Sequence, residues 1–291
     1  MTECASPYPP PAPPFAGAYT AFAQVFPELR IQHRRAAHPH EGWVRTPRLL
    51  ADPALRARLI ATEARHGLAR YGTAPRPDVA AGFWLHRYTW PLCLLFTLPW
   101  LLERRVPLPT VAQLASRRAA SGGGPAELAL LAAPEPIAFA CLPGDPAARL
   151  PGARPVADEP ALRTALRAAL AEQLAPLLAA FRGELRRGPR TLWGLATDEV
   201  VEGLWYAAGL LGQEARALAE LAALLPEGAD SAPFVGAAAF RTTAFRTAAF
   251  RTAGASRPAG PPTPVRTRVS CCLYYTVRPA DPCVGCPRSC G

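Results

Sequence analysis

The 291-residue sequence contains no lysine and no asparagine, and it has a single methionine. All 32 arginines and lysines are therefore arginines. This bias is typical of GC-rich coding, so the abundance of arginine is not by itself evidence for a nucleic-acid partner. Charged residues make up only 19% of the chain, which excludes a polar chain disordered from end to end. With 50% hydrophobic residues at this length, we expect a substantial buried core and one or two domains.

Long apolar runs are also missing. The longest, Trp90 to Leu102, has about thirteen residues and contains two prolines, whereas a bilayer span needs roughly 20. Near the N-terminus no basic flank leads into an apolar stretch, so we expect no secretory leader. These absences predict a cytoplasmic protein in a reducing compartment, at most peripherally associated with the cytoplasmic membrane.

Several catalytic signatures are absent as well. The sequence has no Walker A loop, no Gly-x-Gly-x-x-Gly, no Gly-x-Ser-x-Gly and no His-Glu-x-x-His. We therefore expect no nicotinamide nucleotide bound by this chain. We also expect no nucleic-acid partner, because most of the net charge of +10 lies in the last fifth of the chain.

Proline and glycine are plentiful without dominating: 35 prolines and 22 glycines make 57 of 291 residues. They divide the chain into four predicted parts. These are a Pro-rich N-terminal arm at 1–44, a helix-rich main domain at 45–239, a basic repeat with a Pro-rich linker at 240–265, and a C-terminal segment at 266–291.

Within the main domain the pattern predicts mostly helices. Expected helices run from the Asp52 cap to Gly72, through the Pro-interrupted apolar segment 83–102, and from Thr110 to Arg118. Three more helices are predicted between 158 and 225, the first interrupted by Pro176. One internal strand is expected at 137–142, and the β-prone run 269–277 leads into the last segment. The predicted fold class is α+β, with a helical main body and a small C-terminal lobe.

Charge is concentrated near the C-terminus. Residues 240–291 hold eight arginines and one acid, Asp281, a net charge of +7, while the first 239 residues carry 24 arginines against 21 acids, a net of +3. Part of this charge lies in a tandem repeat of Phe-Arg-Thr at 240–242, 245–247 and 250–252. Its period of five matches neither a helix nor a strand, so we interpret it as a linker, with a basic-aromatic contact to a membrane or nucleic acid as the alternative.

The same region holds a cysteine motif: Cys271-Cys272, ten residues, then Cys283-Val-Gly-Cys286. The two-residue spacing lets the last pair face one metal site from a tight turn, and Gly285 relieves that turn sterically. Four thiolates are the ligand set of a tetrahedral zinc site or of a [2Fe–2S] cluster. Neighbouring side chains on an extended strand point to opposite faces, so the adjacent pair fits a two-iron cluster better than one ion.

This motif resembles that of the FhuF-type ferric-siderophore reductases, which carry a [2Fe–2S] cluster on a C-terminal Cys-Cys-x10-Cys-x2-Cys. The surroundings are similar to that family too: Arg266-x-Arg268 precedes Ser270-Cys-Cys-Leu-Tyr-Tyr, and upstream stand Tyr88-Thr-Trp-Pro-Leu and Leu192-Trp193-Gly194. The resemblance covers roughly residues 83–286 and is specific only at its end. It implies that Cys271, Cys272, Cys283 and Cys286 bind the cluster, with Cys290 as an extra thiol.

The resemblance further implies one-electron reduction of the Fe(III) of a siderophore, of the hydroxamate type by preference, to Fe(II). Since a bound [2Fe–2S] cluster would be the redox centre, no catalytic acid, base or nucleophile is expected. Electrons are expected from a partner protein or a reduced flavin. Arginines 266, 268, 278 and 288 would compensate the negative cluster and steer an acidic donor, or would merely be solubilising.

Two other functions stay open on the sequence. The cysteines would also suit a zinc-binding interaction module, or a [2Fe–2S] electron-transfer or redox-sensing protein without reductase activity.

Other candidate residues have a structural interpretation that we prefer. Histidines 33, 38 and 40 lack partners at metal-binding spacing, Cys93 and Cys141 lie in apolar runs typical of a core, and the acids of Asp198-Glu199-x-x-Glu202 predict a solvated helix face. Trp193, Trp205 and Tyr206 have the helical spacing of core residues, with a siderophore pocket as the alternative.

Overall fold

A computed structural model describes residues 12–118, 125–132, 136–228, 231–243, 263–280, 283 and 285–288. These residues form an α+β fold, which confirms the predicted class. The α-helices of this part of the chain are α1 (Ala16–Val25), α2 (Thr46–Ala51), α3 (Pro53–Tyr71), α4 (Pro77–Glu103), α5 (Glu159–Leu185), α6 (Pro189–Leu210) and α7 (Glu214–Leu224). Its strands are β1 (Arg30–Arg34), β2 (Trp43–Arg45), β3 (Arg105–Leu108), β4 (Leu114–Arg118), β5 (Pro125–Leu131), β6 (Ala138–Cys141), β7 (Ala153–Pro155), β8 (Arg241–Thr243) and β9 (Thr263–Val265).

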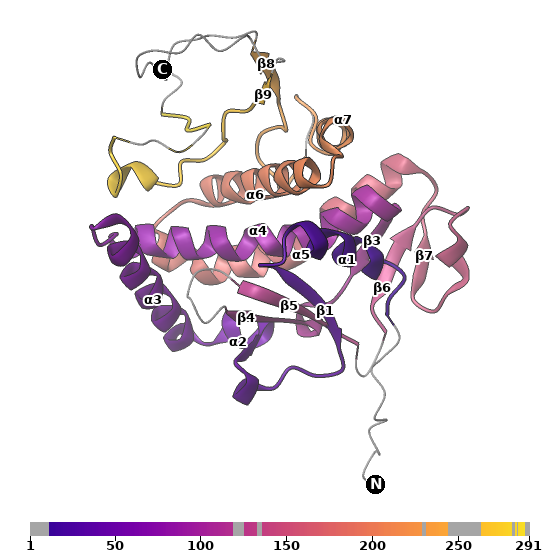
Figure 1. Cartoon of the computed structure of the whole chain (residues 1–291), viewed down its shortest axis with the longest axis horizontal. Helices are drawn as coiled ribbons and strands as arrows, with labels where there is room; N and C mark the ends of the chain where they lie inside the picture. Colours follow the sequence, from indigo (N-terminus) through magenta and orange to yellow (C-terminus); the bar gives the residue numbers. More distant parts are fainter. Residues whose placement is uncertain are drawn as a thin grey trace.

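Helix α4 is the centre of the fold. It crosses the middle of the molecule, with strands β1, β4 and β5 on one side and α6 on the other (Figure 1). Most of its residues between Val79 and Leu101 are buried, and its buried threonines 89 and 97 donate their hydroxyls to carbonyls one turn back, at 2.7 and 3.0 Å. Pro91 and Pro99 lie inside the helix, as the sequence predicted for this buried segment.

Two sheets pack beside this helix. The four-stranded sheet has the order β1-β5-β4-β2, with β1 parallel to β5 and the other pairs antiparallel. The smaller sheet, β3-β6-β7, contains the strand predicted at 137–142. The helix predicted from Thr110 to Arg118 is wrong: a single 3-10 turn at Val111–Gln113 is followed directly by β4. Thr110 and Gln113 do form a capping box, but pairing on both edges of β4 outweighs the helix signal that follows it.

The folded body begins well before residue 45. Helix α1 and strand β1 lie within the segment predicted as an N-terminal arm, and Phe15 and Phe22 are fully buried. The ring of Phe15 meets that of Phe139 on β6 with centroids 6.0 Å apart. Only the part of the expected arm before residue 12 lies outside the described residues.

The other predicted helices are confirmed. Asp52 caps α3 by accepting the Leu55 N–H at 2.9 Å, and Gly72 ends the helix in the left-handed conformation. Helices α5, α6 and α7 occupy the region 158–225. Within the described residues no helix is both long and apolar enough to cross a bilayer.

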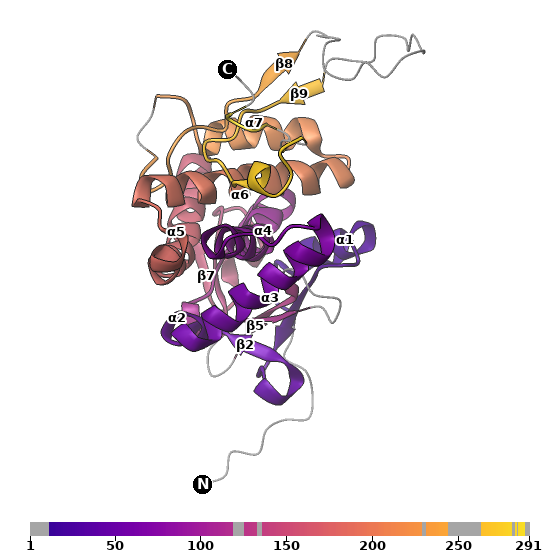
Figure 2. The same ribbon diagram turned by 90° about the vertical axis from the view of Figure 1, so that its left-hand side faces the viewer.

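The C-terminal residues lie against α6. In Figures 1 and 2 the yellow segment that follows β9 runs along the side of α6 that faces away from the four-stranded sheet. The Phe-Arg-Thr repeat beyond Thr243 and most of the Pro-rich linker fall outside the described residues. The β-prone run 269–277 is not a strand: it forms loops and one 3-10 turn, Tyr274–Thr276.

Candidate functional site

A buried acidic cluster on α6 organises the candidate site. Asp198 and Glu199 are fully buried, and the Glu202 side chain is 28% exposed. Glycine at position 194, one turn before Asp198, lets the chain at Val269 come close, since an added Cβ would lie 3.1 Å from that side chain. This face of α6 is therefore shaped to receive the segment 266–270.

Asp198 binds that segment through four contacts. Its carboxylate accepts the backbone N–H groups of Val269 and Ser270, each at 2.8 Å. It also accepts the Ser270 hydroxyl at 2.9 Å and Arg266 Nη1 at 2.8 Å. A carboxylate with this many donors satisfies its lone pairs without water, which explains how it can be buried. Because Ser270 directly precedes Cys271, Asp198 fixes the backbone at the start of the cysteine motif.

Two buried arginines complete the cluster. The side chain of Arg266 is 1% exposed, and that of Arg268 is 7% exposed. Arg268 pairs with Glu199 at 3.2 Å and with Glu202 at 3.3 Å, and Arg266 lies 3.5 Å from Glu202. Three carboxylates thus face two guanidinium groups, so arginine pairing leaves one negative charge uncompensated.

The pKa values reflect this surplus of acids. Burial raises the pKa of Glu202 to about 7; Arg268 opposes the rise, and Asp198 and Glu199 add to it. Burial by itself would lower the pKa of Arg268, but the surrounding carboxylates outweigh it and raise that pKa. Glu202 therefore titrates near neutral pH, while Arg268 keeps its charge.

The prediction of a solvated acidic face at Asp198, Glu199 and Glu202 is wrong, and so is the view that Arg266 and Arg268 merely solubilise the chain. Each set is buried against the other. The available sequence signal was an acidic run inside an otherwise apolar helix together with Arg-x-Arg just before the cysteines. Recognising the pairing required knowing that segments about 68 residues apart meet.

The cysteines follow directly. Leu273 adopts a left-handed conformation that turns the chain after Cys272 into the 3-10 turn, and Arg187 of the α5–α6 connection donates to the Cys271 carbonyl at 2.9 Å. Cys272 and Cys283, which have ten residues between them in the motif, have their sulfurs 3.5 Å apart. The Cys286 N–H donates to the Cys283 carbonyl at 3.1 Å, closing the turn that the two-residue spacing predicted.

Gly285 is required in that turn. Its φ of +69° is left-handed, and a Cβ added there would lie 2.5 Å from the Arg266 carbonyl oxygen. Its own carbonyl accepts the Arg268 N–H at 2.8 Å. The turn carrying Cys283 and Cys286 is thus joined by backbone contacts to the two arginines of the acidic cluster.

The sulfur positions fit a metal-bound set in part. Two sulfurs bound to one tetrahedral iron or zinc at about 2.3 Å lie roughly 3.8 Å apart, close to the Cys272–Cys283 separation. Burial and the neighbouring Cys272 raise the pKa of Cys283 to about 12, with a further contribution from Cys286, so two thiolates here need a positive charge between them. The donor set therefore suits a thiolate-bound cation or cluster.

The structure does not bring all four cysteines to one point. Among the described residues no group of three or more His, Cys, Asp or Glu side chains converges as for a single metal ion. The Cys271 backbone carbonyl accepts a hydrogen bond from Arg187. Cys290 lies outside the described residues.

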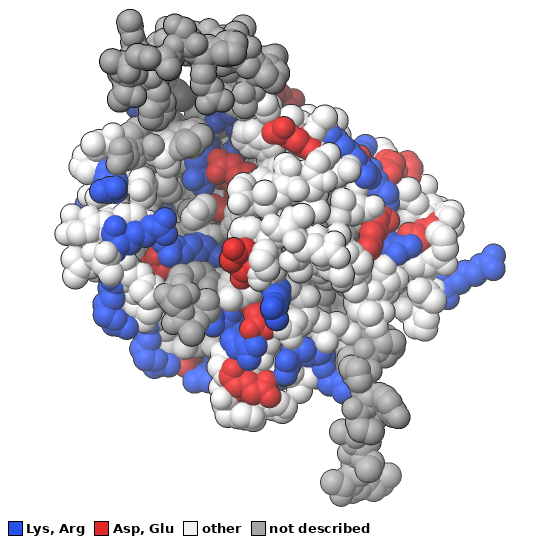
Figure 3. All heavy atoms as spheres, in the orientation of Figure 1, with Lys and Arg blue, Asp and Glu red and all other residues white. Residues whose placement is uncertain are grey.

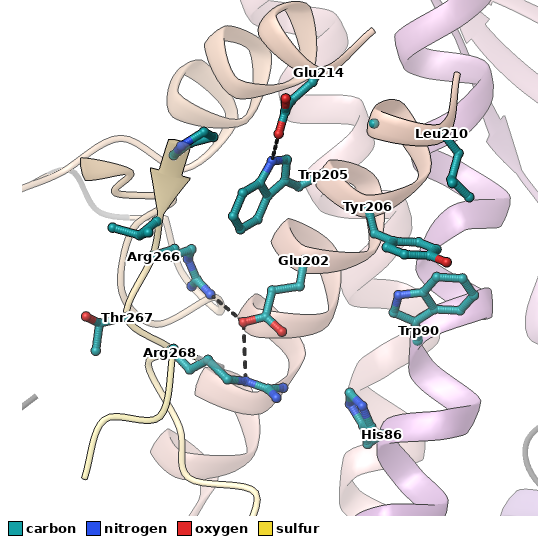
Figure 4. Close-up of a pocket in the computed structure, with 14 residues that line it drawn as sticks. His86, Trp90, Glu202, Trp205, Tyr206, Leu210, Glu214, Arg266, Thr267 and Arg268 are labelled. Carbon is teal, nitrogen blue, oxygen red and sulfur yellow. Dashed lines mark hydrogen bonds and ion pairs between the residues drawn. The ribbon is translucent and has the colours of Figure 1, made fainter. Parts of the chain in front are cut away.

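A cavity of about 790 Å³ opens beside the cluster. Its lining combines the aromatic side chains Trp90, Trp205 and Tyr206 with Glu202, Glu214, Arg266 and Arg268. In Figure 4 the Glu202 side chain projects between Trp205 on one side and Trp90 and Tyr206 on the other. Arg266 and Arg268 are joined to Glu202, and His86 lies beyond it on α4. The alternative assignment of Trp205 and Tyr206 to a pocket thus agrees with the structure, whereas Trp193 packs on Phe234 instead.

A second, smaller hollow of about 300 Å³ reaches the sulfurs. Cys272 and Cys283 line it together with Tyr71, Phe83 and Tyr274. Arg268 and His86 line both hollows, so these two side chains separate the sulfur pair from the large cavity. The His86 ring is oriented by a hydrogen bond between its Nδ1 and the Oε1 of the buried Glu199.

Cys93, Cys141 and the histidines named as candidates lie outside this site. Cys93 and Cys141 are fully buried in the core, as predicted. The rings of His38 and His40 stack on each other, and His33 lies on strand β1.

Comparison with known proteins adds no family to this picture. No protein-family model matches the chain, and no curated protein does.

Proposed function

We propose that this protein is a ferric-siderophore reductase, which reduces chelated Fe(III) to Fe(II) one electron at a time and so releases the iron. One observation carries the proposal: the sulfur pair of Cys272 and Cys283 opens into a hollow that shares Arg268 and His86 with a cavity of about 790 Å³. Since ligand pockets for small molecules measure about 300–1,000 Å³, that cavity has the size for an organic iron chelate.

Cys271, Cys272, Cys283 and Cys286 are the proposed ligands of a [2Fe–2S] cluster. When bound, such a cluster supplies one-electron reduction at a potential set by its charge, its hydrogen bonds and its exposure to solvent. The chain's part is to orient the four thiolates. Arg268 lies next to this set and opposes the rise in the pKa of Cys283, and Gly285 and Asp198 fix the backbone on either side.

The cavity favours an uncharged chelate over a strongly anionic one. Its arginines are already paired with buried carboxylates, so they have little attraction left for an anion. Ferric complexes with three hydroxamates are neutral, whereas those with three catecholates carry several negative charges. This supports the hydroxamate type as substrate.

Arginines on another face support an acidic electron donor, although a reduced flavin would also fit the reaction. On the face in Figure 3 arginines gather on the left-hand side, over α3, where positions 58, 65 and 70 are exposed. Arg70 and Arg87 line the hollow that holds the two sulfurs, and none of the described residues that line it is a carboxylate. Such a surface would steer an acidic partner. The proposed reaction belongs on the cytoplasmic side of siderophore uptake, with peripheral membrane association as a further expectation.

Analysis of iron and acid-labile sulfide per chain, with an absorption spectrum, tests the proposal first. We expect about two iron and two sulfide ions per chain and a red-brown colour. A colourless protein that contains zinc would contradict the reductase proposal and favour the zinc-binding interaction module. The chemically reduced protein should then be mixed with a ferric trihydroxamate and an Fe(II) trap. Trapping no faster than with the Cys272→Ser variant would favour an electron-transfer or sensing protein instead.

A further inference from the structure

The large cavity combines aromatic rings with carboxylates. Trp90 and Tyr206 meet edge to face, with centroids 5.9 Å apart, and Trp205 stands on the opposite wall in Figure 4. Glu202 and Glu214 line the same space. Aromatic faces together with carboxylates are the combination that binds organic cations, because the ring quadrupole and the carboxylate both attract positive charge.

The described residues around the cavity carry a net negative charge. Among them, Glu202 and Glu214 line the cavity and Asp198 and Glu199 lie behind its two arginines, so four carboxylates face two guanidinium groups, giving −2 with Glu202 ionised and −1 with it protonated. His86 would offset one further charge when protonated. An anionic ligand would therefore be repelled and a cationic one attracted.

Glu214 is the carboxylate best placed to meet such a ligand. It is exposed at the start of α7 and forms no ion pair with a described residue. Its Oε1 accepts the indole N–H of Trp205 at 2.7 Å, which fixes the orientation of that ring. The Tyr206 side chain, on the next position of α6, is half exposed. An ammonium group between these three side chains would meet a carboxylate and aromatic faces together.

We propose that the cavity selects chelates that carry a positively charged amine, with the ammonium group bound by Glu214, Trp205 and Tyr206. This inference rests on the proposed function for the chelate, but the recognition itself depends only on the cavity. It names a substrate feature, the cationic tail, that the cysteine motif does not specify.

A matched pair of ligands tests it without any electron transfer. The probes are the Ga(III) complexes of a linear trihydroxamate with a terminal primary amine and of the same chelator with that amine acetylated. Ga(III) has the charge of Fe(III) but is not reduced under these conditions. Calorimetry with the full-length protein at low salt should show the amine form binding about tenfold more tightly, a preference that falls as salt is added.

Variants locate the preference. Glu214→Gln should weaken binding of the amine form and so reduce the preference to less than threefold. Glu172→Gln, an exposed acid on α5 outside the cavity, is the matched control and should keep the full preference. Equal affinities of the wild-type protein for the two chelates would overturn the inference and leave the proposed function standing. Binding of neither would overturn the inference and the placement of the chelate in this cavity.

Discussion

Replacing Asp198 should loosen the cysteine motif from the main body. In Asp198→Ala, two backbone N–H groups, the Ser270 hydroxyl and Arg266 Nη1 lose their common acceptor while still buried. Breaking a buried ion pair by removing one partner costs about 3–5 kcal/mol, and unsatisfied buried donors add to that cost. We therefore expect a loss of at least about 3 kcal/mol in the free energy of unfolding.

Urea unfolding of the purified variant measures this loss. A surface ion pair supplies the control: Arg34 and Glu41 lie 2.9 Å apart but are about one-third exposed, so Glu41→Gln should cost less than about 1 kcal/mol. Asp198→Asn, which keeps the shape and one acceptor, separates charge from packing and should fall between the two.

A local measurement distinguishes positioning from general stability. Amide hydrogen exchange at Val269 and Ser270 should accelerate in Asp198→Asn under conditions where most of the chain stays folded. Binding of Co(II) to the reduced cysteines, followed by its thiolate charge-transfer bands, should weaken about tenfold. A variant with wild-type exchange at both amides and unchanged Co(II) affinity would refute the role assigned to Asp198.

Three further changes test other parts of the site. Gly285→Ala should lower the free energy of unfolding by about 1–2 kcal/mol, because the φ of Gly285 is left-handed and the added Cβ would clash with the Arg266 carbonyl. Gly144→Ala is the control, since open space surrounds Gly144, and it should leave the free energy of unfolding unchanged. Urea unfolding measures both variants. Since burial raises the pKa of Glu202 to about 7 from the ordinary 4.5, the folded state keeps a proton that the unfolded chain loses, so stability should fall as pH rises from about 4.5 to 7. Glu202→Gln should remove that dependence, so the urea midpoints of the variant at pH 5 and pH 8 should be equal, whereas the wild-type midpoint should be lower at pH 8. Tyr274→Ala should remove ring contacts to α3 and α4 and speed proteolysis of the C-terminal segment, whereas an unchanged cleavage rate would show that these rings do not hold it.

Sequence periodicity located most of the helices because their signals are local. Asp52 and Gly72 cap α3 from inside the sequence, and the leucine stripe of α5 needs no distant partner to be recognised. The failures were of another kind. Thr110–Arg118 became mostly strand because β5 and β2 pair with it, and β2, about 70 residues earlier in the chain, leaves little trace in local composition.

The site divides in the same way. Spacing predicted the turn that carries Cys283 and Cys286 and its need for glycine, and the structure confirms both. The pairing of Asp198 with Arg266 was missed, because a charged run on a helix is usually solvated and nothing near it in sequence shows what covers it. The cavity was anticipated only in part, through Trp205 and Tyr206, because its other walls come from α4 and from residues 264–268.

The buried carboxylates argue that the cysteine segment and the main body form one unit. Asp198 and Glu199 lie on a helix whose flanks are apolar, and without Arg266 and Arg268 they would be ionised groups facing a low-dielectric interior. Pairing with Arg266 and Arg268 avoids the cost of burying these carboxylates alone, and this stabilises the packing of the segment 266–270 on α6. That placement in turn puts the sulfurs of Cys272 and Cys283 against Arg268 and closes one wall of the large cavity. The cluster of Asp198, Glu199, Glu202, Arg266 and Arg268, which the sequence pattern did not predict, thus positions both the Cys272–Cys283 sulfur pair and the large cavity beside it.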